Sequence, residues 1–367
     1  MQGHVAIVGA SGVIGTAAVG HFGRAAEWRV TSMSRRKPIV MPDVRHSHVA
    51  LDLEDRDGCR KAVSKLPPIT HLIYAAVKEK PGLVAGWSDP ETIAENGRMF
   101  EAILDAVAAQ GQLRHVLVLQ GTKAYGGLYH PVMVPAKEDR PRDDHPNFYW
   151  LHEDYARKSA SIHGFAVTIF RPQIVLGDAP GVVMNPVLPF GAYAALCREL
   201  DMPFAYPGAK AALWEMTDAP LLAQAFDWAF ETPAAQGQIF NVTNGDVLVL
   251  ADVWRQFAAA LGHTDGGAKE LNFAEFFGDP SVQEAWRRIA HVNNLLIDDL
   301  QAFVGESHHY ADLLLGPRIA SRAIPVLVST IKLRKTGFGE CRDSLDSFLA
   351  ALGRLEDLRL LPRLRRF

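Results

Sequence analysis

The chain opens with the run His4-Val5-Ala6-Ile7-Val8-Gly9-Ala10-Ser11-Gly12-Val13-Ile14-Gly15, in which a short apolar stretch leads directly into a glycine-rich turn. An apolar stretch of this length, bounded by glycine, is typical of a buried parallel strand. Helical spacing follows over 16–22, so the local order is strand, glycine turn, helix. In that order Gly9 permits a tight turn, Gly12 lets backbone approach a pyrophosphate, and Gly15 allows close packing of helix on strand.

Free N–H groups at the start of such a helix bind phosphate oxygens, and the helix dipole favours the negative charge there. The strand and the helix on either side supply the context that a glycine triplet needs to indicate a nucleotide site. We therefore predict a dinucleotide phosphate site formed by Gly9, Ser11, Gly12, Val13, Ile14 and Gly15. The spacing is GxxGxxG, which resembles the extended and atypical short-chain dehydrogenase/reductase families.

The residues after the next strand, expected over 28–33, indicate which cofactor is bound. An NAD site places Asp or Glu there to accept from the ribose hydroxyls, whereas this chain has Ser34-Arg35-Arg36. Guanidinium groups bind a 2′-phosphate through charge-assisted hydrogen bonds, so the cofactor predicted is NADPH. The alternative is two solvated surface arginines. Asp52-Leu53, after a strand over 48–51, suits the adenine edge, although Asp52 is also a common strand-end turn residue.

Short apolar runs and helical segments continue to alternate, which predicts an α/β fold of the Rossmann type with a doubly wound parallel sheet. Further strands are expected over 71–76, 115–119 and 165–170, and a helix over 96–109. Ligands of such sheets lie beyond the carboxyl ends of the strands. The cofactor contacts predicted at those ends are Ala75, Ala76, Gln120, Gly121, Pro172 and Ile174.

Composition narrows the class of protein. The chain has 367 residues, of which 48% are hydrophobic and 22% charged, which argues against disorder. A net charge of only -3 provides no basic field for nucleic acid or anionic membrane. The three cysteines are in no metal-ligand or disulfide pattern, which favours a reducing compartment. No apolar run is long enough to span a bilayer, and no signal-peptide pattern precedes the first strand. A cytoplasmic enzyme is expected.

Two segments after the strand over 115–119 contain the candidate catalytic residues. The first is Gln120-Gly121-Thr122-Lys123-Ala124-Tyr125-Gly126, and the second, Asn147-Phe148-Tyr149-Trp150, opens a helix. Most short-chain reductases carry Tyr-x-x-x-Lys on this helix, but the fourth residue after Tyr149 is Glu153. The usual serine after the strand is also replaced, by Gly121. The common site is therefore incomplete.

Lys123 at the strand end, together with Tyr149, offers a replacement, because an ammonium near a phenol favours the phenolate and lowers the tyrosine pKa. Both residues would face the nicotinamide, so each is a candidate for cofactor binding as well as for catalysis. The alternative is that Lys123 is a solvated loop lysine and Tyr149 an aromatic that packs the start of the helix.

These two segments resemble the progesterone 5β-reductase/iridoid synthase-like family of atypical short-chain reductases. The resemblance extends to Arg171-Pro172, Phe240-Asn241-Val242-Thr243-Asn244-Gly245-Asp246 and Asp343-Ser344. It implies NADPH-dependent reduction of activated C=C bonds, with Lys123 and Tyr149 as the functional pair. The chain departs from the family pattern on the expected pocket wall, where Ala124 replaces histidine, Leu128 replaces proline and Trp150 replaces a frequent second tyrosine.

The resulting hypothesis is hydride addition to the β-carbon of an enone or enal, with Tyr149 binding the enolate oxygen and Lys123 supporting Tyr149. A carbonyl reductase or alcohol dehydrogenase on the same fold, and a non-catalytic NADPH sensor, remain alternatives. A small-molecule enone or enal is the partner expected; nucleic acid and membrane are excluded, and a homodimer is left open.

The composition shifts after Gly177, which predicts a second, smaller and mostly helical domain. The boundaries expected are 1–177 for the NADP-binding domain with 212–245 returning to it, and 178–211 with 246–367 for a substrate-binding cap. Candidates for the pocket wall are Tyr129, Met184, Trp214 and Met216, with core packing as the alternative for each.

Overall fold

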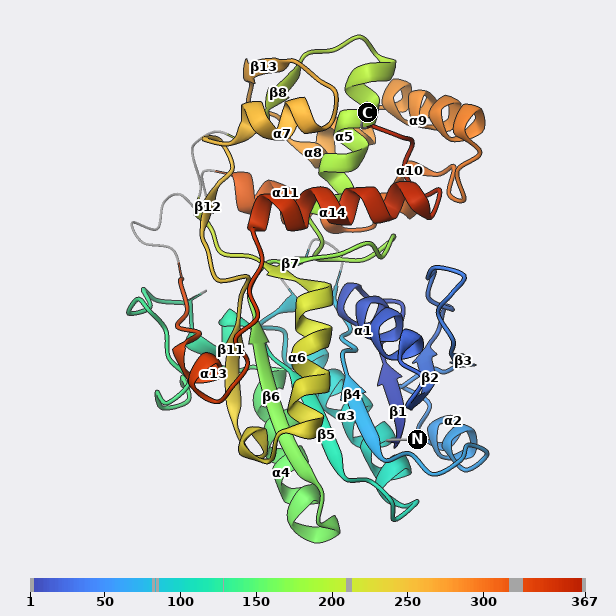
Figure 1. Cartoon of the computed structure of the whole chain (residues 1–367), viewed down its shortest axis with the longest axis vertical. Coiled ribbons are helices and arrows are strands. Elements are labelled where there is room, and N and C mark those ends of the chain that lie inside the picture. Colours follow the sequence, from blue (N-terminus) through green and yellow to red (C-terminus); the bar gives the residue numbers. More distant parts are fainter. Residues whose placement is uncertain are drawn as a thin grey trace. The chain divides into compact units, whose positions relative to one another are not determined.

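The computed structural model describes residues 3–80, 83, 86–127, 129–208, 213–316 and 326–364. The chain forms two compact units, whose helices and strands are labelled as in Figure 1. Unit 1 comprises Met1–Gln173, Ala219–Thr243 and Val326–Cys341. Unit 2 comprises Ile174–Asp218, Asn244–Pro325 and Arg342–Phe367.

Unit 1 is built on a parallel sheet of seven strands in the order β11-β6-β5-β4-β1-β2-β3. The strands are β1 (Gly3–Val8), β2 (Trp28–Ser34), β3 (Ser47–Ala50), β4 (His71–Tyr74), β5 (His115–Leu119), β6 (Ala166–Pro172) and β11 (Ile239–Val242). The order runs outward from β1 in both directions, so the predicted doubly wound Rossmann fold is confirmed.

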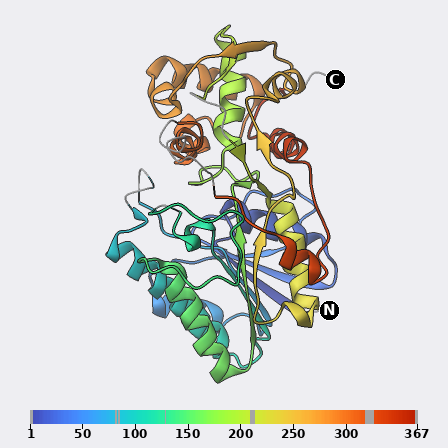
Figure 2. The same cartoon turned by 90° about the vertical axis from the view of Figure 1, so that its left-hand side faces the viewer.

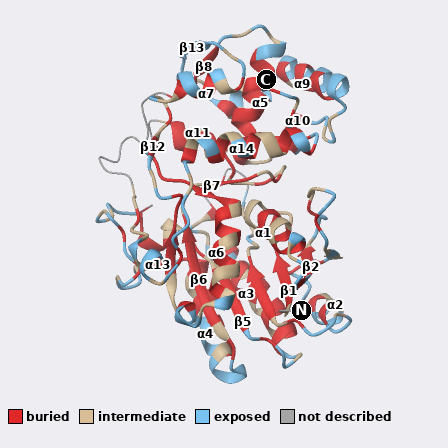
Figure 3. Cartoon of the chain, viewed as in Figure 1, coloured by how far each residue is buried: buried red, intermediate tan, exposed pale blue. Residues whose placement is uncertain are grey.

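Helices cover both faces of this sheet (Figures 1 and 2). One face carries α1 (Val13–Arg24) and α6 (Ala219–Glu231), and the other carries α2 (Arg56–Val63), α3 (Pro90–Ala108) and α4 (Phe148–His163). Successive residues of a strand point to opposite faces. In β1, Val5 and Ile7 join the core under α1 and α6, whereas Ala6 and Val8 join the core under α3. Burial on both faces explains why the central strands are continuous apolar runs (Figure 3).

Unit 2 is mostly helical. Among the residues that the structure describes, its helices are α5 (Val187–Glu199), α7 (Trp254–Ala260), α8 (Phe273–Gly278), α9 (Pro280–Asn293), α10 (Leu300–Val304), α11 (Ser307–Leu315) and α14 (Ser344–Asp357). Three short strand pairs accompany them, namely β7 (Val175–Leu176) with β10 (Thr217–Asp218), β8 (Phe204–Tyr206) with β13 (Asp265–Ala268), and β9 (Leu213–Trp214) with β12 (Leu248–Val249). Phe190 of α5 is fully buried and contacts the rings of Trp214, Trp254, Phe257, Phe273 and Phe348.

The segment Val326–Cys341 lies in unit 1, whereas the sequence predicts it in the cap. It contains α13 (Ile331–Lys335), which packs beside β11. Leu333 and Phe338 enter the core under α6, where the ring of Phe338 lies 5.6 Å from that of Trp228. Burial of these two apolar side chains stabilises the packing of a third stretch of the chain against unit 1. The other boundaries of the compact units fall at Gln173 and at Ala219–Thr243, whereas the sequence predicts 177 and 212–245.

Within the described residues, no helix combines the length and the apolar character that a membrane span requires.

Two buried histidines, His71 and His115, lie side by side at the amino-terminal ends of β4 and β5; we call them the histidine row. His71 pairs in register with Val5 of β1 and with His115 of β5. The His71 ring packs on Trp28 and on Phe230, at 4.9 and 4.5 Å between ring centres. Burial lowers the pKa of His71 to about 4, assisted by the nearby charge of Arg114 and opposed by Asp227. Burial also lowers the pKa of His115 to about 4. Both histidines are therefore neutral in the folded protein at neutral pH.

We predict that this row destabilises the protein in mild acid. Unfolded histidine binds its proton near pH 6.5, so the unfolded chain gains protons first as the pH falls from 6.5 towards 4. Across that window each histidine should remove about 2–3 kcal/mol from the free energy of unfolding. Urea unfolding at several pH values measures this loss. The variant His71→Gln/His115→Gln should lose less stability than wild type over the same window, and an equal loss would refute the assignment.

Candidate active site

The glycine turn packs directly against the ends of two neighbouring strands. Gly9 has φ +80°, and a Cβ at this position would lie 2.6 Å from backbone atoms of Ala75 and Ala76. The N–H groups of Gly9 and Ala10 both donate to the carbonyl of Met33, at 2.9 and 3.2 Å. Only glycine combines the left-handed backbone with this close approach. The turn is therefore held at the carboxyl ends of β2 and β4.

The first turn of α1 is available to an anion. Gly12 is the N-cap, and no side chain of the described residues caps this helix end. A Cβ on Gly12 would lie 3.2 Å from the Gly9 carbonyl oxygen, and one on Gly15 would clash with that oxygen. Around this turn Ser11, Gly12, Val13 and Ile14 are half-buried. Backbone N–H groups and the positive end of the helix dipole thus lie at a half-buried turn, and the first turn of α1 contains no acidic side chain.

The predicted ribose and adenine residues follow the next two strands. Ser34 ends β2, and its hydroxyl donates to the carbonyl of Arg36 at 2.7 Å. The side chains of Arg35 and Arg36 are exposed. Asp52 is also exposed and accepts from the N–H of Glu54 at 3.0 Å, which is the turn contact considered as its alternative role.

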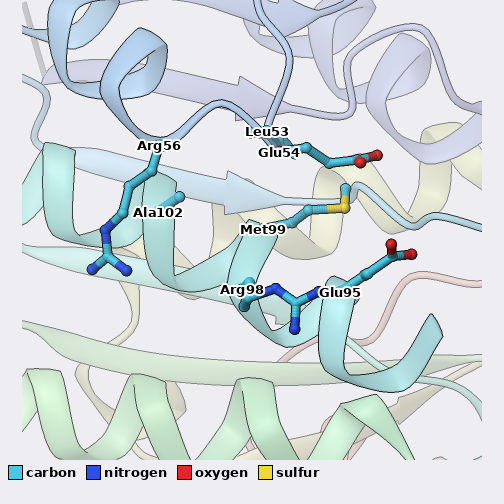
Figure 4. A pocket seen from close by; sticks show the side chains of 7 residues that line it. All are labelled: Leu53, Glu54, Arg56, Glu95, Arg98, Met99 and Ala102. Carbon is cyan, nitrogen blue, oxygen red and sulfur yellow. The ribbon is translucent and has the colours of Figure 1, made fainter. Parts of the chain in front are cut away.

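Leu53 is buried and lines a pocket of about 230 Å³ between the start of α2 and α3 (Figure 4). The pocket is lined by Leu53, Glu54, Arg56, Glu95, Arg98, Met99 and Ala102. Lys78 forms ion pairs with Glu54 and Glu95, at 2.9 and 3.1 Å. The pocket therefore combines an apolar floor with a charged rim.

Tyr149 lies against the residue that stands where a serine is usual. Asn147 caps α4, and its side-chain oxygen accepts from the N–H of Tyr149 at 3.0 Å. A Cβ on Gly121 would lie 3.1 Å from the Tyr149 hydroxyl oxygen and 3.7 Å from the Pro172 carbonyl oxygen. Because Gly121 has no side chain, the phenol of Tyr149 fits against it. Gly121 itself precedes Lys123 by two residues in the chain.

Lys123 is enclosed by two residues that the sequence did not single out. It belongs to the short 3-10 helix η2 (Thr122–Tyr125), and its side chain is 18% exposed. Its Nζ lies 3.9 Å from the ring centre of Trp87 and 3.8 Å from Oε1 of Glu79. Burial lowers the pKa of Lys123, and the Glu79 carboxylate opposes that shift. Lys123 is therefore not a solvated loop lysine.

A chain of buried polar side chains connects the elements that carry the two catalytic candidates. Gln120 follows β5, and its amide nitrogen donates to Oε2 of Glu153 at 3.1 Å. Its amide oxygen accepts from Nε of Arg171 at 2.8 Å. The Arg171 guanidinium also lies over the ring of Tyr125, which ends η2. These contacts connect β5, β6, η2 and α4.

The remaining predicted contacts are distributed over both units. In unit 1, Tyr129 is exposed and its ring lies 4.9 Å from that of His145. Leu128 lies outside the described residues. In unit 2, Ile174 and Met184 are half-buried, whereas Trp214 and Met216 are 1% and 0% exposed. Trp214 packs on Phe190, so the core contact considered for it is present. A ligand role for these residues stays a prediction.

Comparison with known proteins identifies relatives over most of the chain. A (S)-8-oxocitronellyl enol synthase of Antirrhinum majus is 29% identical over 356 residues, covering 91% of this chain and 86% of that protein. A 3-oxo-Delta(4,5)-steroid 5-beta-reductase of Arabidopsis thaliana is 28% identical over 350 residues, with the same coverage of both chains. The predicted resemblance to the progesterone 5β-reductase/iridoid synthase-like reductases is confirmed by these matches.

Solved structures show the same fold in more distant proteins. The UDP-glucose 4-epimerase of Thermus thermophilus, a complex with NAD, has a TM-score of 0.63 at 18% identity and covers 96% of this chain and 99% of its own. A short-chain dehydrogenase/reductase superfamily protein of Agrobacterium tumefaciens with bound NAD has a TM-score of 0.60 at 14% identity, covering 96% and 97%. The model of the NAD dependent epimerase/dehydratase family matches residues 5–243. The chain belongs to the NAD dependent epimerase/dehydratase family, and its sequence is similar to the enol synthase and the steroid 5-beta-reductase named above.

Proposed function

We propose that this protein reduces the activated C=C bond of an enone or enal with NADPH. The observation that carries the proposal is the position of the Tyr149 hydroxyl against Gly121, beside the η2 helix that holds the half-buried Lys123. The steroid reductase relative from Arabidopsis, whose name refers to a 3-oxo-Δ(4,5) substrate, supports an enone as the substrate class.

The residues at the strand ends fit NADPH. The start of α1, which no side chain of the described residues caps, and the glycine backbone suit the pyrophosphate. Arg35 and Arg36 are exposed at the end of β2 and suit the 2′-phosphate. Leu53, on the apolar floor of the pocket in Figure 4, suits the adenine edge. When bound, NADPH supplies the hydride that adds to the β-carbon. The other cofactor contacts proposed are Ala75, Ala76, Gln120, Pro172 and Ile174.

Tyr149 and Lys123 stabilise the negative charge that this addition creates on the substrate. Negative charge develops on the carbonyl oxygen of the substrate, where the Tyr149 hydroxyl donates a hydrogen bond. A donor aimed at developing charge lowers a barrier by roughly 3–4 kcal/mol. The Lys123 ammonium supports the Tyr149 hydroxyl electrostatically in this role, since a positive charge favours negative charge nearby. The α-carbon then takes a proton from water, so Tyr149 need not lose its own.

The substrate contacts proposed are Tyr129, Met184, Trp214 and Met216, and the compartment proposed is the cytoplasm. A homodimer stays a prediction.

Tyr149→Phe should lower kcat for enone reduction by about 10²-fold, because one donor to the enolate oxygen is lost. Lys123→Met should lower kcat as well. Tyr155→Phe is the matched control, since Tyr155 lies on the same helix and bonds Asp105 instead. The rate of NADPH oxidation with a panel of enones and enals measures kcat for each variant, and NMR identifies the product. An allylic alcohol as product would establish carbonyl reduction, and NADPH binding without turnover would establish a sensor.

Arg35→Ala and Arg36→Ala should each raise the Kd of NADPH by about tenfold or more and leave that of NADH unchanged, because charge-assisted hydrogen bonds to the 2′-phosphate are lost. Titration of protein fluorescence with each cofactor measures the two constants. Arg24→Ala is the control, as Arg24 pairs with Asp43 on the surface. An unchanged ratio of the two constants would show that these arginines do not select the cofactor.

Gly121→Ala should lower kcat by up to about tenfold, since its methyl group displaces the Tyr149 hydroxyl by a few tenths of an ångström. Gly278→Ala is the control, because a Cβ at Gly278 meets no atom within 4 Å. Steady-state kinetics and thermal melting of both variants separate a loss of catalysis from a loss of stability. Wild-type kcat in Gly121→Ala would mean that the position of this hydroxyl is not critical.

A further inference from the structure

Glu79 is a buried carboxylate that the proposed mechanism leaves unused. It lies in the loop after β4, and its side chain is only 4% exposed. Its neighbours Lys78 and Lys80 point to surface partners, Lys78 to Glu54 and Glu95, and Lys80 to Asp89. A buried carboxylate costs several kcal/mol unless it is paired and hydrogen-bonded. Glu79 therefore requires a partner that accounts for its position.

Lys123 is that partner. Oε1 of Glu79 lies 3.8 Å from Nζ of Lys123 and, among the described residues, accepts no hydrogen bond. Oε2 accepts from the indole N–H of Trp87 at 3.0 Å. The ring of the same Trp87 lies 3.9 Å from Nζ. A single tryptophan thus holds the carboxylate through its N–H and the ammonium through its π face.

Other charged and titratable groups near η2 belong to different elements. Tyr149 comes from α4, and Arg171 of β6 lies over the ring of Tyr125. Glu138 interacts with Arg171 and Lys332. Burial lowers the pKa of Lys123, and Glu79 is the group that raises it. The charge of Lys123 in this enclosed position therefore depends on Glu79.

We propose that Glu79 is a positioning residue for the reduction: its carboxylate keeps the Lys123 ammonium charged and, with the ring of Trp87, directs it to the site of Tyr149. This inference rests on the proposed function, because the ammonium matters only if Tyr149 faces developing charge. Without Glu79, Lys123 loses its proton at a lower pH, and its support of Tyr149 ends there.

The protonation of Lys123 is measurable without any turnover. Trace acetylation with acetic anhydride from about pH 6 to 11, followed by mass spectrometry of the peptide that contains Lys123, yields its titration midpoint. In Glu79→Gln we expect this midpoint to fall by about 1–3 pH units relative to wild type, the usual effect of an opposite charge at this range. Glu91→Gln is the control, since Glu91 is an exposed carboxylate at the start of α3. In this variant the titration midpoint of Lys123 should equal that of wild type.

An unchanged midpoint in Glu79→Gln would overturn the proposal. If circular dichroism shows that Glu79→Gln does not fold, Trp87→Leu decides, because the ring stabilises the ammonium through its π face and its loss should lower the midpoint by about 0.5–1 pH unit. An unchanged midpoint in folded Trp87→Leu would likewise overturn it.

The pH profile of kcat/KM for an enone gives the functional readout. The alkaline limb should move to lower pH in Glu79→Gln and return towards the wild-type position in Glu79→Asp, with the Kd of NADPH unchanged in both. A uniform loss of activity without a shift of the limb would indicate a merely structural role and refute the proposal. If wild type reduces no enone, the proposed function fails, whereas the acetylation midpoints still decide whether Glu79 controls Lys123.

Discussion

The close approach of the Gly9 backbone to the backbone of Ala75 and Ala76 is the contact from which the geometry of unit 1 follows. A Cβ at position 9 would lie only 2.6 Å from backbone atoms of Ala75 and Ala76, so no residue with a side chain fits there. It holds the turn between β1 and α1 against the end of β4, and the carbonyl of Met33 fixes the same turn to β2. The start of α1 is thereby directed to the edge where the parallel strands end.

The register of the sheet then determines which loops meet at that edge. Tyr74 of β4 is paired with Val118 of β5, so the two strands end at nearly the same level. The loops that follow carry Glu79 and Lys123, and these side chains approach each other across adjacent strand ends. Strand order and register thus bring together two loops that are distant in the sequence, and Trp87 contacts both members of the ion pair that forms there.

Local patterns in the sequence were enough to predict the sheet and the glycine turn between β1 and α1. The runs at β1, β4 and β5 are apolar because both faces of each strand are buried, and such runs are visible without a structure. The partner of Lys123 was not predictable in this way. Lys78-Glu79-Lys80 reads as a solvated charged loop, and only the fold shows that the middle residue turns inward. Likewise, Leu333 and Phe338 lie far along the chain from the core of unit 1 that they enter.

Glu153 occupies the position at which the Tyr-x-x-x-Lys motif carries its lysine, and it has a different role in this chain. On one helix, residues four apart share a face, so helix geometry alone sets a tyrosine beside a lysine. Here Tyr149 and Lys123 come from different elements, and something else must fix their separation. Glu153, four residues after Tyr149, accepts from the amide of Gln120 at 3.1 Å and from Nε of Arg157 at 3.0 Å. Since Gln120 precedes the η2 helix by two residues, Glu153 ties α4 to the segment that holds Lys123. Glu153, at the position where Tyr-x-x-x-Lys carries its lysine, thus restrains α4 against the segment that holds Lys123.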